Sequence, residues 1–188
     1  MKTSKTIPRQ RLKRLNSAHE NPKGRYVLYW MQQSQRAEYN HALEYAVQQA
    51  NKIDQGVLVV FGLMDDYPEA NLRHYTFMLE GLQETRAALG RRGIKMVVQN
   101  GNPADVALSA GKNASLIVCD RGYLRHQIKW RKKVAENAGC RVVQIESDVV
   151  VPDRYSYIDL GERDQPNPLQ WDKISPAEYE PWDDYLDY

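Results

Sequence analysis

Aromatic, amide and arginine side chains gather where three apolar runs of the sequence end. Arg36 and Arg121 could bind an acidic or phosphate group, while Trp30 and Tyr123 offer flat faces for stacking. The full set of candidate binding residues is Trp30, Met31, Gln32, Gln35, Arg36, Phe61, Gly62, Leu63, Asp120, Arg121, Tyr123 and Arg125. A structural role is the alternative for each, because strand-end aromatic residues often close the top of a sheet and arginines often pair with nearby acids.

The turn that carries the first of these residues contains no glycine. The stretch YVLYWMQQSQRAEYNHALEYAVQQA, residues 26–50, begins as a buried strand and ends as an amphipathic helix, with the turn MQQSQR between them. In an α/β domain, ligands collect beyond the carboxyl ends of the strands, and nucleotide phosphates are usually cradled there by glycine-rich turns. The sequence therefore raises the question of what a glycine-free version of this corner holds.

Five short runs rich in Val, Ile and aromatic residues alternate with helical patterns. The predicted strands are Tyr26–Trp30, Val57–Phe61, Ile94–Val98, Ser115–Cys119 and Arg141–Ile145. Continuous apolar runs suit parallel strands buried on both faces. Between the strands, a leucine-rich helical stripe ends at Gly93, and Asn102 followed by Pro103 predicts the start of another helix. The expected fold is a doubly wound, Rossmann-like α/β domain with a five-stranded parallel sheet and helices on both faces.

Several common sites lack their motifs. The sequence has no G-x-G-x-x-G after the first strand, no P-loop and no G-x-S-x-G elbow. Its four histidines lie on separate segments, so we expect no metal site. Cys119 ends one predicted strand and Cys140 begins the next, which places them beyond disulfide reach and predicts two buried free thiols, as in a reducing compartment.

Composition and charge suggest how the chain is divided. It has 188 residues, 42% of them hydrophobic and 27% charged, and no apolar run approaches the ~20 residues of a membrane span. The N-terminus lacks the apolar core of a signal peptide, so a cytoplasmic protein with no membrane contact is expected. We expect a basic arm at residues 1–24, an α/β domain at 25–152 and an acidic tail rich in Pro and aromatic residues at 153–188.

Five stretches in order make the α/β part similar to a known family. They are RYVLYWMQQSQRAEYNHALEYA, VVFGLMDDYPEANLRHYTFMLEGL, NGNPADVAL, VCDRGYLRHQIKWRKKVAE and VVQIESDVVVP. From about Arg9 to Pro152 the chain resembles the N-terminal α/β domain of class II DNA photolyases, in the photolyase/cryptochrome family. The basic RQRLKRLN ahead of the first strand resembles the N-terminal arm of that family.

The resemblance implies a role in light-driven repair of cyclobutane pyrimidine dimers. In that family the N-terminal domain can hold an antenna chromophore, which is 8-hydroxy-5-deazaflavin, methenyltetrahydrofolate or FMN, and the antenna passes excitation energy to FAD in a C-terminal helical domain. A flat chromophore could be held by stacking and side-chain hydrogen bonds, without a phosphate against the backbone. The candidate residues above are the expected chromophore contacts, and no catalytic residue is expected among them.

The sequence after Pro152 does not resemble the family's catalytic half. We therefore expect no FAD in this chain, no dimer repair by the chain alone and, as the alternative to chromophore binding, an interaction half of a split or truncated photolyase that works with a separate FAD-binding chain. The tail is expected to be extended or disordered, and its aromatic residues either dock on apolar surface or have no role. Basic residues around Trp130 make weak, salt-sensitive DNA binding a further possibility beside a simply solvated helix face.

Overall fold

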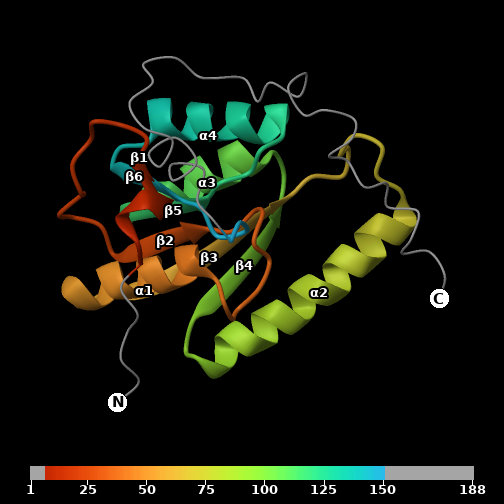
Figure 1. Cartoon of the computed structure of the whole chain (residues 1–188), viewed down its shortest axis with the longest axis horizontal. Coiled ribbons are helices and arrows are strands. Elements are labelled where there is room, and N and C mark those ends of the chain that lie inside the picture. Colours follow the sequence, from red (N-terminus) through yellow and green to blue (C-terminus); the bar gives the residue numbers. More distant parts are fainter. Residues whose placement is uncertain (1–6, 151–188) are drawn as a thin grey trace, which may run out of the picture. The chain divides into compact units, whose positions relative to one another are not determined.

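Six strands pair into one sheet within the described part of the chain, residues 7–150 of the computed structural model (Figure 1). They are β1 (Leu12–Arg14), β2 (Tyr26–Trp30), β3 (Gly56–Leu63), β4 (Lys95–Asn100), β5 (Ala114–Asp120) and β6 (Arg141–Ile145). The strand order is β1-β6-β5-β2-β3-β4, and all neighbours are parallel except β1 and β6. The predicted Rossmann-like α/β class is confirmed, and the chain reverses its direction across the sheet between β2 and β5.

The sheet differs from the prediction by one strand. Leu12–Arg14 pairs antiparallel with β6 in the register Leu12↔Ile145 and Arg14↔Val143, so part of the expected basic arm belongs to the sheet. This strand is three residues long and only Leu12 is apolar, which is why no strand period revealed it. The guanidinium of Arg11 holds the neighbouring segment by donating to the carbonyl oxygens of Glu146, Val149 and Val150.

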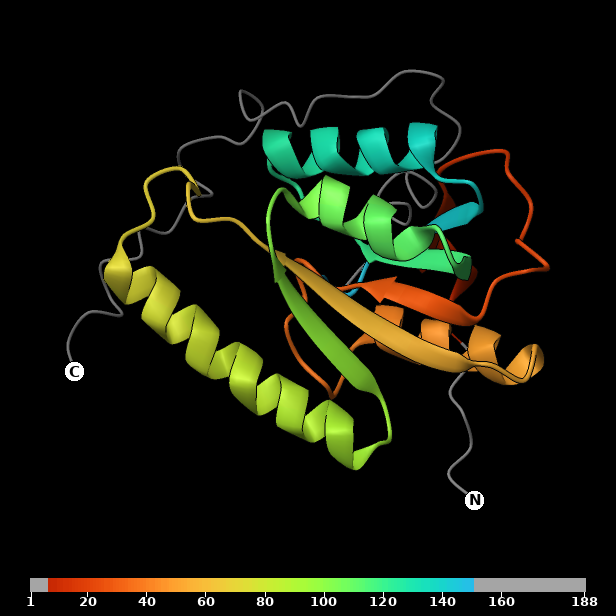
Figure 2. The same ribbon diagram turned by 180° about the vertical axis from the view of Figure 1, so that it is seen from behind.

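Two helices cover each face of the sheet. They are α1 (His41–Lys52) and α2 (Leu72–Arg91) on one face, and α3 (Pro103–Gly111) and α4 (Arg125–Asn137) on the other (Figures 1 and 2). Asn102 caps α3 by accepting a hydrogen bond from the amide of Ala104, and Pro103 takes the first helical position, as predicted. None of the helices within residues 7–150 has the length and apolar character needed to cross a bilayer.

Alternate residues from Val27 to Met31, in β2 and directly after it, enter two different cores. Val27, Tyr29 and Met31 pack with α1 and α2, whereas Leu28 and Trp30 pack with α3 and α4. All five are at most 2% exposed, which explains the unbroken apolar run of the sequence.

The two cysteines are buried free thiols, as predicted. Cys119 is the register partner of Gln144, four residues beyond Cys140. Burial raises the pKa of Cys119 to about 12 and that of Cys140 to about 11, so both stay protonated and unreactive at neutral pH.

Helix α2 extends beyond the sheet that it covers. Its 20 residues span about 30 Å, whereas the six residues of the edge strand β4 span only about 20 Å. The buried residues Leu82, Thr85 and Leu89 therefore lie in its C-terminal half, while Leu72 is 82% and Leu79 44% exposed. The predicted leucine stripe is buried only from Leu82 onward. The first half of α2, from which Met78 packs against the core, is a largely free-standing wall.

Gly62 near the end of β3 is required by packing against α3. A Cβ atom at this position would lie 2.5 Å from Cα of Pro103, a backbone atom that cannot move aside. We expect Gly62→Ala to lower the free energy of unfolding by about 1–3 kcal/mol in urea denaturation. Gly81→Ala is the matched control, because this exposed α2 position has open space and alanine should there stabilise by about 0.5–1 kcal/mol. Equal effects of the two changes would contradict the packing role.

Candidate functional site

The carboxylate of Asp120 is bound inside the glycine-free turn. Its Oδ2 atom accepts hydrogen bonds from the backbone amides of Gln32 (2.9 Å), Gln33 (3.0 Å) and Ser34 (3.1 Å). Its Oδ1 atom accepts one from the hydroxyl of Tyr29 at 2.7 Å. Successive backbone amides that converge in this way form an anion-binding concavity. The turn after β2 therefore does hold an anion, and the anion is a side chain supplied by the end of β5.

Asn40 fixes the other side of the same turn. Its side chain accepts from the amide of Leu43 and so caps α1. The amide nitrogen donates to the Tyr29 hydroxyl (2.9 Å) and to the carbonyl oxygens of Ser34 (2.9 Å) and Arg36 (3.0 Å). One buried network thus joins β2, the turn, β5 and the start of α1.

Burial shapes the acid–base behaviour of this network. Desolvation raises the pKa of Asp120, and the hydrogen bonds from the turn amides and from Tyr29 lower it only in part. Desolvation also raises the pKa of Tyr29 well above its usual value, with the nearby Asp120 charge adding to the effect. Tyr29 therefore stays a hydrogen-bond donor to Asp120 at physiological pH.

A cleft of about 570 Å³ opens beside this turn, beyond the ends of β2 and β3. The free-standing half of α2 and the first turns of α4 form its walls. It is lined by Gln32, Gln33, Gln35, Phe61, Gly62, Leu63, Met64, Tyr67, Pro68, Glu69, Ala70, His74, Tyr75, Met78, Leu124, Gln127 and Trp130. Its volume lies within the usual range for small-molecule sites, and the lining combines aromatic rings with amide groups.

Aromatic contacts join the β3–α2 loop to α4 across the cleft. The Tyr67 hydroxyl lies 3.0 Å from Nε2 of His126, and the rings of Tyr67 and His126 meet edge to face with centroids 5.2 Å apart. His126 in turn packs against Trp130 at a centroid distance of 4.8 Å. Tyr75 steadies the loop that carries Tyr67, because its hydroxyl donates to the carbonyl of Met64 and accepts from the amide of Tyr67.

The structure places five of the predicted site residues on the cleft and seven elsewhere. Gln32, Gln35, Phe61, Gly62 and Leu63 line it. Trp30 and Met31 are buried in the two cores, and Asp120 lies within the turn with 4% of its surface exposed.

The three predicted arginines lie outside the lining. Arg36 pairs with Asp148 at 2.7 Å, and Arg121 pairs with Glu146 at 3.1 Å while lying over the ring of Tyr123. Arg125 is the exposed first residue of α4. The Tyr123 hydroxyl also bonds to Glu146. These side chains hold loops together around the carboxyl end of the sheet.

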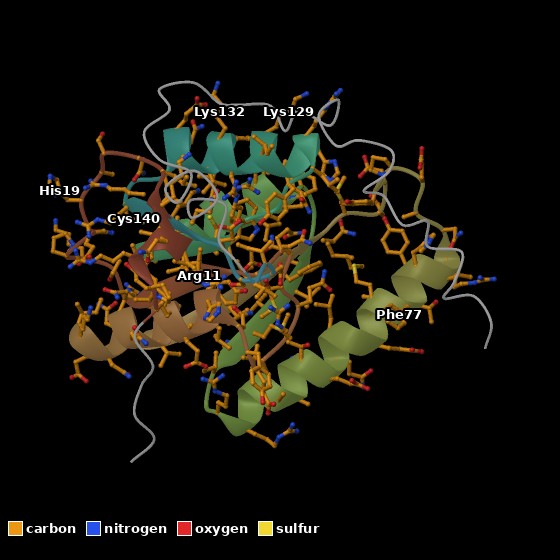
Figure 3. All side chains as sticks on the ribbon, in the orientation of Figure 1. Arg11, His19, Phe77, Lys129, Lys132 and Cys140 are labelled. Atoms are coloured by element: carbon orange, nitrogen blue, oxygen red, sulfur yellow. The ribbon has the colours of Figure 1, made fainter. Side chains whose placement is uncertain are left out.

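Most of the remaining lining residues escaped sequence reasoning. Tyr67 lies in a loop, and Tyr75 and Trp130 lie in helices. Neither sequence pattern indicates which way each ring faces. One sequence feature could have indicated these lining residues: the first half of α2 has more apolar residues than the sheet can bury. Lys129 and Lys132, considered for nucleic-acid contact, project from α4 away from the sheet (Figure 3).

The raised pKa of Asp120 predicts a pH-dependent contribution to stability. The carboxyl ionises near pH 4 in the unfolded chain and at higher pH in the folded protein, so the unfolded state binds fewer protons between these values. The Asp120 contribution to the free energy of unfolding must therefore fall as the pH rises through this interval and level off above it. Asp120→Asn lacks this component. We expect the stability of the wild type minus that of the variant, measured in urea from pH 4 upward, to decrease with pH; an increase would contradict the assignment.

The chain matches known proteins over most of the described region. The family model for DNA photolyase matches residues 27–155. The deoxyribodipyrimidine photo-lyase of Methanothermobacter thermautotrophicus is 44% identical over 146 residues, which cover 78% of this chain and 33% of the relative. The enzyme of the same name from Potorous tridactylus is 31% identical over 138 residues, covering 71% of this chain and 26% of the relative. The chain thus spans a third or less of these relatives.

Other similarities are weaker or fall outside the described residues. A model for the C-terminal domain of tail specific protease matches residues 155–187, the segment on which the predictions for the acidic tail fall; this segment lies outside the described residues. Among solved structures, a universal stress protein from Archaeoglobus fulgidus in complex with dAMP has a TM-score of 0.45 at 15% identity, covering 65% of this chain and 98% of that one. A functionally unknown protein from Pseudomonas aeruginosa has a TM-score of 0.48 at 14% identity, covering 78% and 53%. These scores carry no functional argument.

The family resemblance of the sequence is thereby confirmed: the DNA photolyase model covers more than half of the chain, which belongs to the DNA photolyase family.

Proposed function

We propose that the cleft binds a flat antenna chromophore that serves flavin-dependent photorepair of pyrimidine dimers. The observation that supports this most strongly is the cleft itself, about 570 Å³ at the carboxyl ends of β2 and β3 and lined by aromatic and amide side chains. A tricyclic or pteridine ring fits a site of this size, and parallel α/β sheets bind their ligands at this end.

The lining suits a heterocycle with an amide-like edge. Phe61, Tyr67, Tyr75 and Trp130 provide ring surface for packing against a flat ligand. The glutamines on the floor and on α4 carry both donors and acceptors, which complement the alternating carbonyl and N–H groups of a flavin, deazaflavin or folate ring. Gln33 and Gln127 already hydrogen-bond to each other at 2.8 Å, so the amides belong to an ordered floor.

In this proposal the α/β domain holds the chromophore in place. Energy transfer requires that a chromophore be held rigidly and kept from water, and it requires no acid, base or nucleophile from the protein. Contacts between Tyr67, His126 and Trp130 provide this rigidity by joining the β3–α2 loop to α4. The chemistry of dimer splitting belongs to a flavin-binding domain of the family and requires no group in this cleft.

Chromophore binding can be tested by fluorescence titration with a deazaflavin, a reduced folate and FMN. We expect saturable binding of at least one of them, weakened about tenfold by Trp130→Leu because a stacking surface is lost. Phe77→Ala is the matched control, because Phe77 is an aromatic residue of α2 that is 80% exposed and outside the lining (Figure 3). If none of the three compounds binds, or if both variants bind like the wild type, the proposal fails.

A further inference from the structure

The anion position of the turn after β2 is already filled. Three backbone amides donate to Oδ2 of Asp120 at 2.9–3.1 Å, and Tyr29 donates to Oδ1. In the usual dinucleotide corner, the amides of this turn would receive a phosphate. Here a second anion would find those donors occupied and a buried negative charge beneath them.

The cleft beside the turn offers no cation of its own. No Lys or Arg belongs to its lining, and the one acidic residue there is Glu69, on the exposed β3–α2 loop. The same loop carries Asp65 and Asp66, both exposed. Within the lining itself the acidic side chain is Glu69, and its charge disfavours the approach of a phosphate.

Three arginines near the cleft are bound to other groups of the protein. Arg36 and Arg121 form ion pairs with Asp148 and Glu146. Arg131 donates to the side chain of Gln144 and to the carbonyl of Gly122.

The remaining basic residues near the opening lie outside the lining. Arg73 and Arg125 lie in the exposed first turns of α2 and α4, and Lys129 and Lys132 project from α4 away from the sheet (Figure 3). Among the described residues, no lysine or arginine lines the cleft.

We infer that the cleft selects an unphosphorylated heterocycle, because Asp120 occupies the anion position of the turn and Glu69 places a negative charge in the lining. The inference rests on the proposed function and narrows its ligand class. Recognition then depends on neutral groups: Gln35 donates to the carbonyl of Gln32 at 3.3 Å and keeps its amide oxygen as an acceptor, for which no partner occurs among the described residues.

Riboflavin and FMN form a suitable pair of probes, because they share one ring system and differ by a terminal phosphate. The titration is run at pH 8 and at low salt, where charge effects are strongest. We expect FMN to bind the wild type roughly three- to fivefold more weakly than riboflavin, the size expected for a doubly charged phosphate about 10 Å from one exposed carboxylate.

Reversing the charge at the rim should reverse this preference. Glu69→Lys is expected to shift the ratio of FMN to riboflavin affinity roughly tenfold toward FMN, because a repulsive charge becomes an attractive one. Glu80→Lys makes the same charge change at an exposed α2 position outside the lining and should leave the ratio at its wild-type value.

The role of Asp120 is tested separately by anion rescue. Asp120→Gly frees the three turn amides, so inorganic phosphate should raise the melting temperature of this variant by several degrees relative to chloride at equal ionic strength, and should leave the wild type unchanged. Failure of phosphate to stabilise a folded variant would overturn the assignment of Asp120. If the variant does not fold, the riboflavin and FMN titration of Asp120→Asn decides: removal of the buried charge should move the affinity ratio toward FMN, and an unchanged ratio would overturn the role of Asp120.

The outcomes separate the two proposals. Binding of FMN to the wild type as tightly as riboflavin, or more tightly, would overturn the selectivity and leave the chromophore site intact. Binding of neither flavin, together with no binding of a deazaflavin or folate, would overturn the proposed function and this inference with it. Weaker FMN binding that Glu69→Lys reverses would support both.

Discussion

The bond between the Asp120 carboxylate and the turn after β2 is the interaction on which the site depends. It joins the end of β5 to the end of β2 across the point where the chain reverses direction in the sheet. A buried carboxylate is costly unless it is hydrogen-bonded, and here three amides and one hydroxyl satisfy it. The turn follows a fixed path as a result, and that path places Gln32 and Gln35 on the floor of the cleft and Asn40 at the start of α1.

The cleft exists because two helices pass beyond the sheet that supports them. α2 is longer than the edge strand β4, and most of its first half extends beyond the strand ends, with Met78 still packed against the core. α4 begins on the opposite face and contributes Leu124, Gln127 and Trp130. The Tyr67–His126 contact joins the β3–α2 loop to α4. The apolar residues of α2 and α4 that have no sheet surface to pack against thus line the cleft.

Sequence patterns predicted the parallel strands and helices because local rules govern both. Continuous apolar runs predicted β2 and β5, and the Asn102–Pro103 pair predicted the start of α3. The short strand β1 was missed because three residues with one apolar side chain carry no period. The candidate cleft lies at loops that the sequence singled out, and five of the twelve predicted residues line it; that they bind a ligand stays a prediction. Arg36 meets Asp148 and Asp120 meets the turn through contacts 112 and 86–88 residues apart, and no spacing in the sequence encodes such pairs.

The absence of glycine from the corner follows from the same interaction. In a glycine-rich turn the backbone amides have no internal hydrogen-bond acceptor, and the turn takes its final conformation when a phosphate binds. Part of the conformational entropy of the turn is therefore lost on binding. With Asp120 as an internal anion, the turn can be built from Gln33, Ser34 and their neighbours, and it is ordered when the chain folds. A ligand then meets a preformed floor. For the proposed antenna chromophore, a fixed orientation would matter more than tight electrostatic binding, and the Asp120 carboxylate fixes the turn without a phosphate.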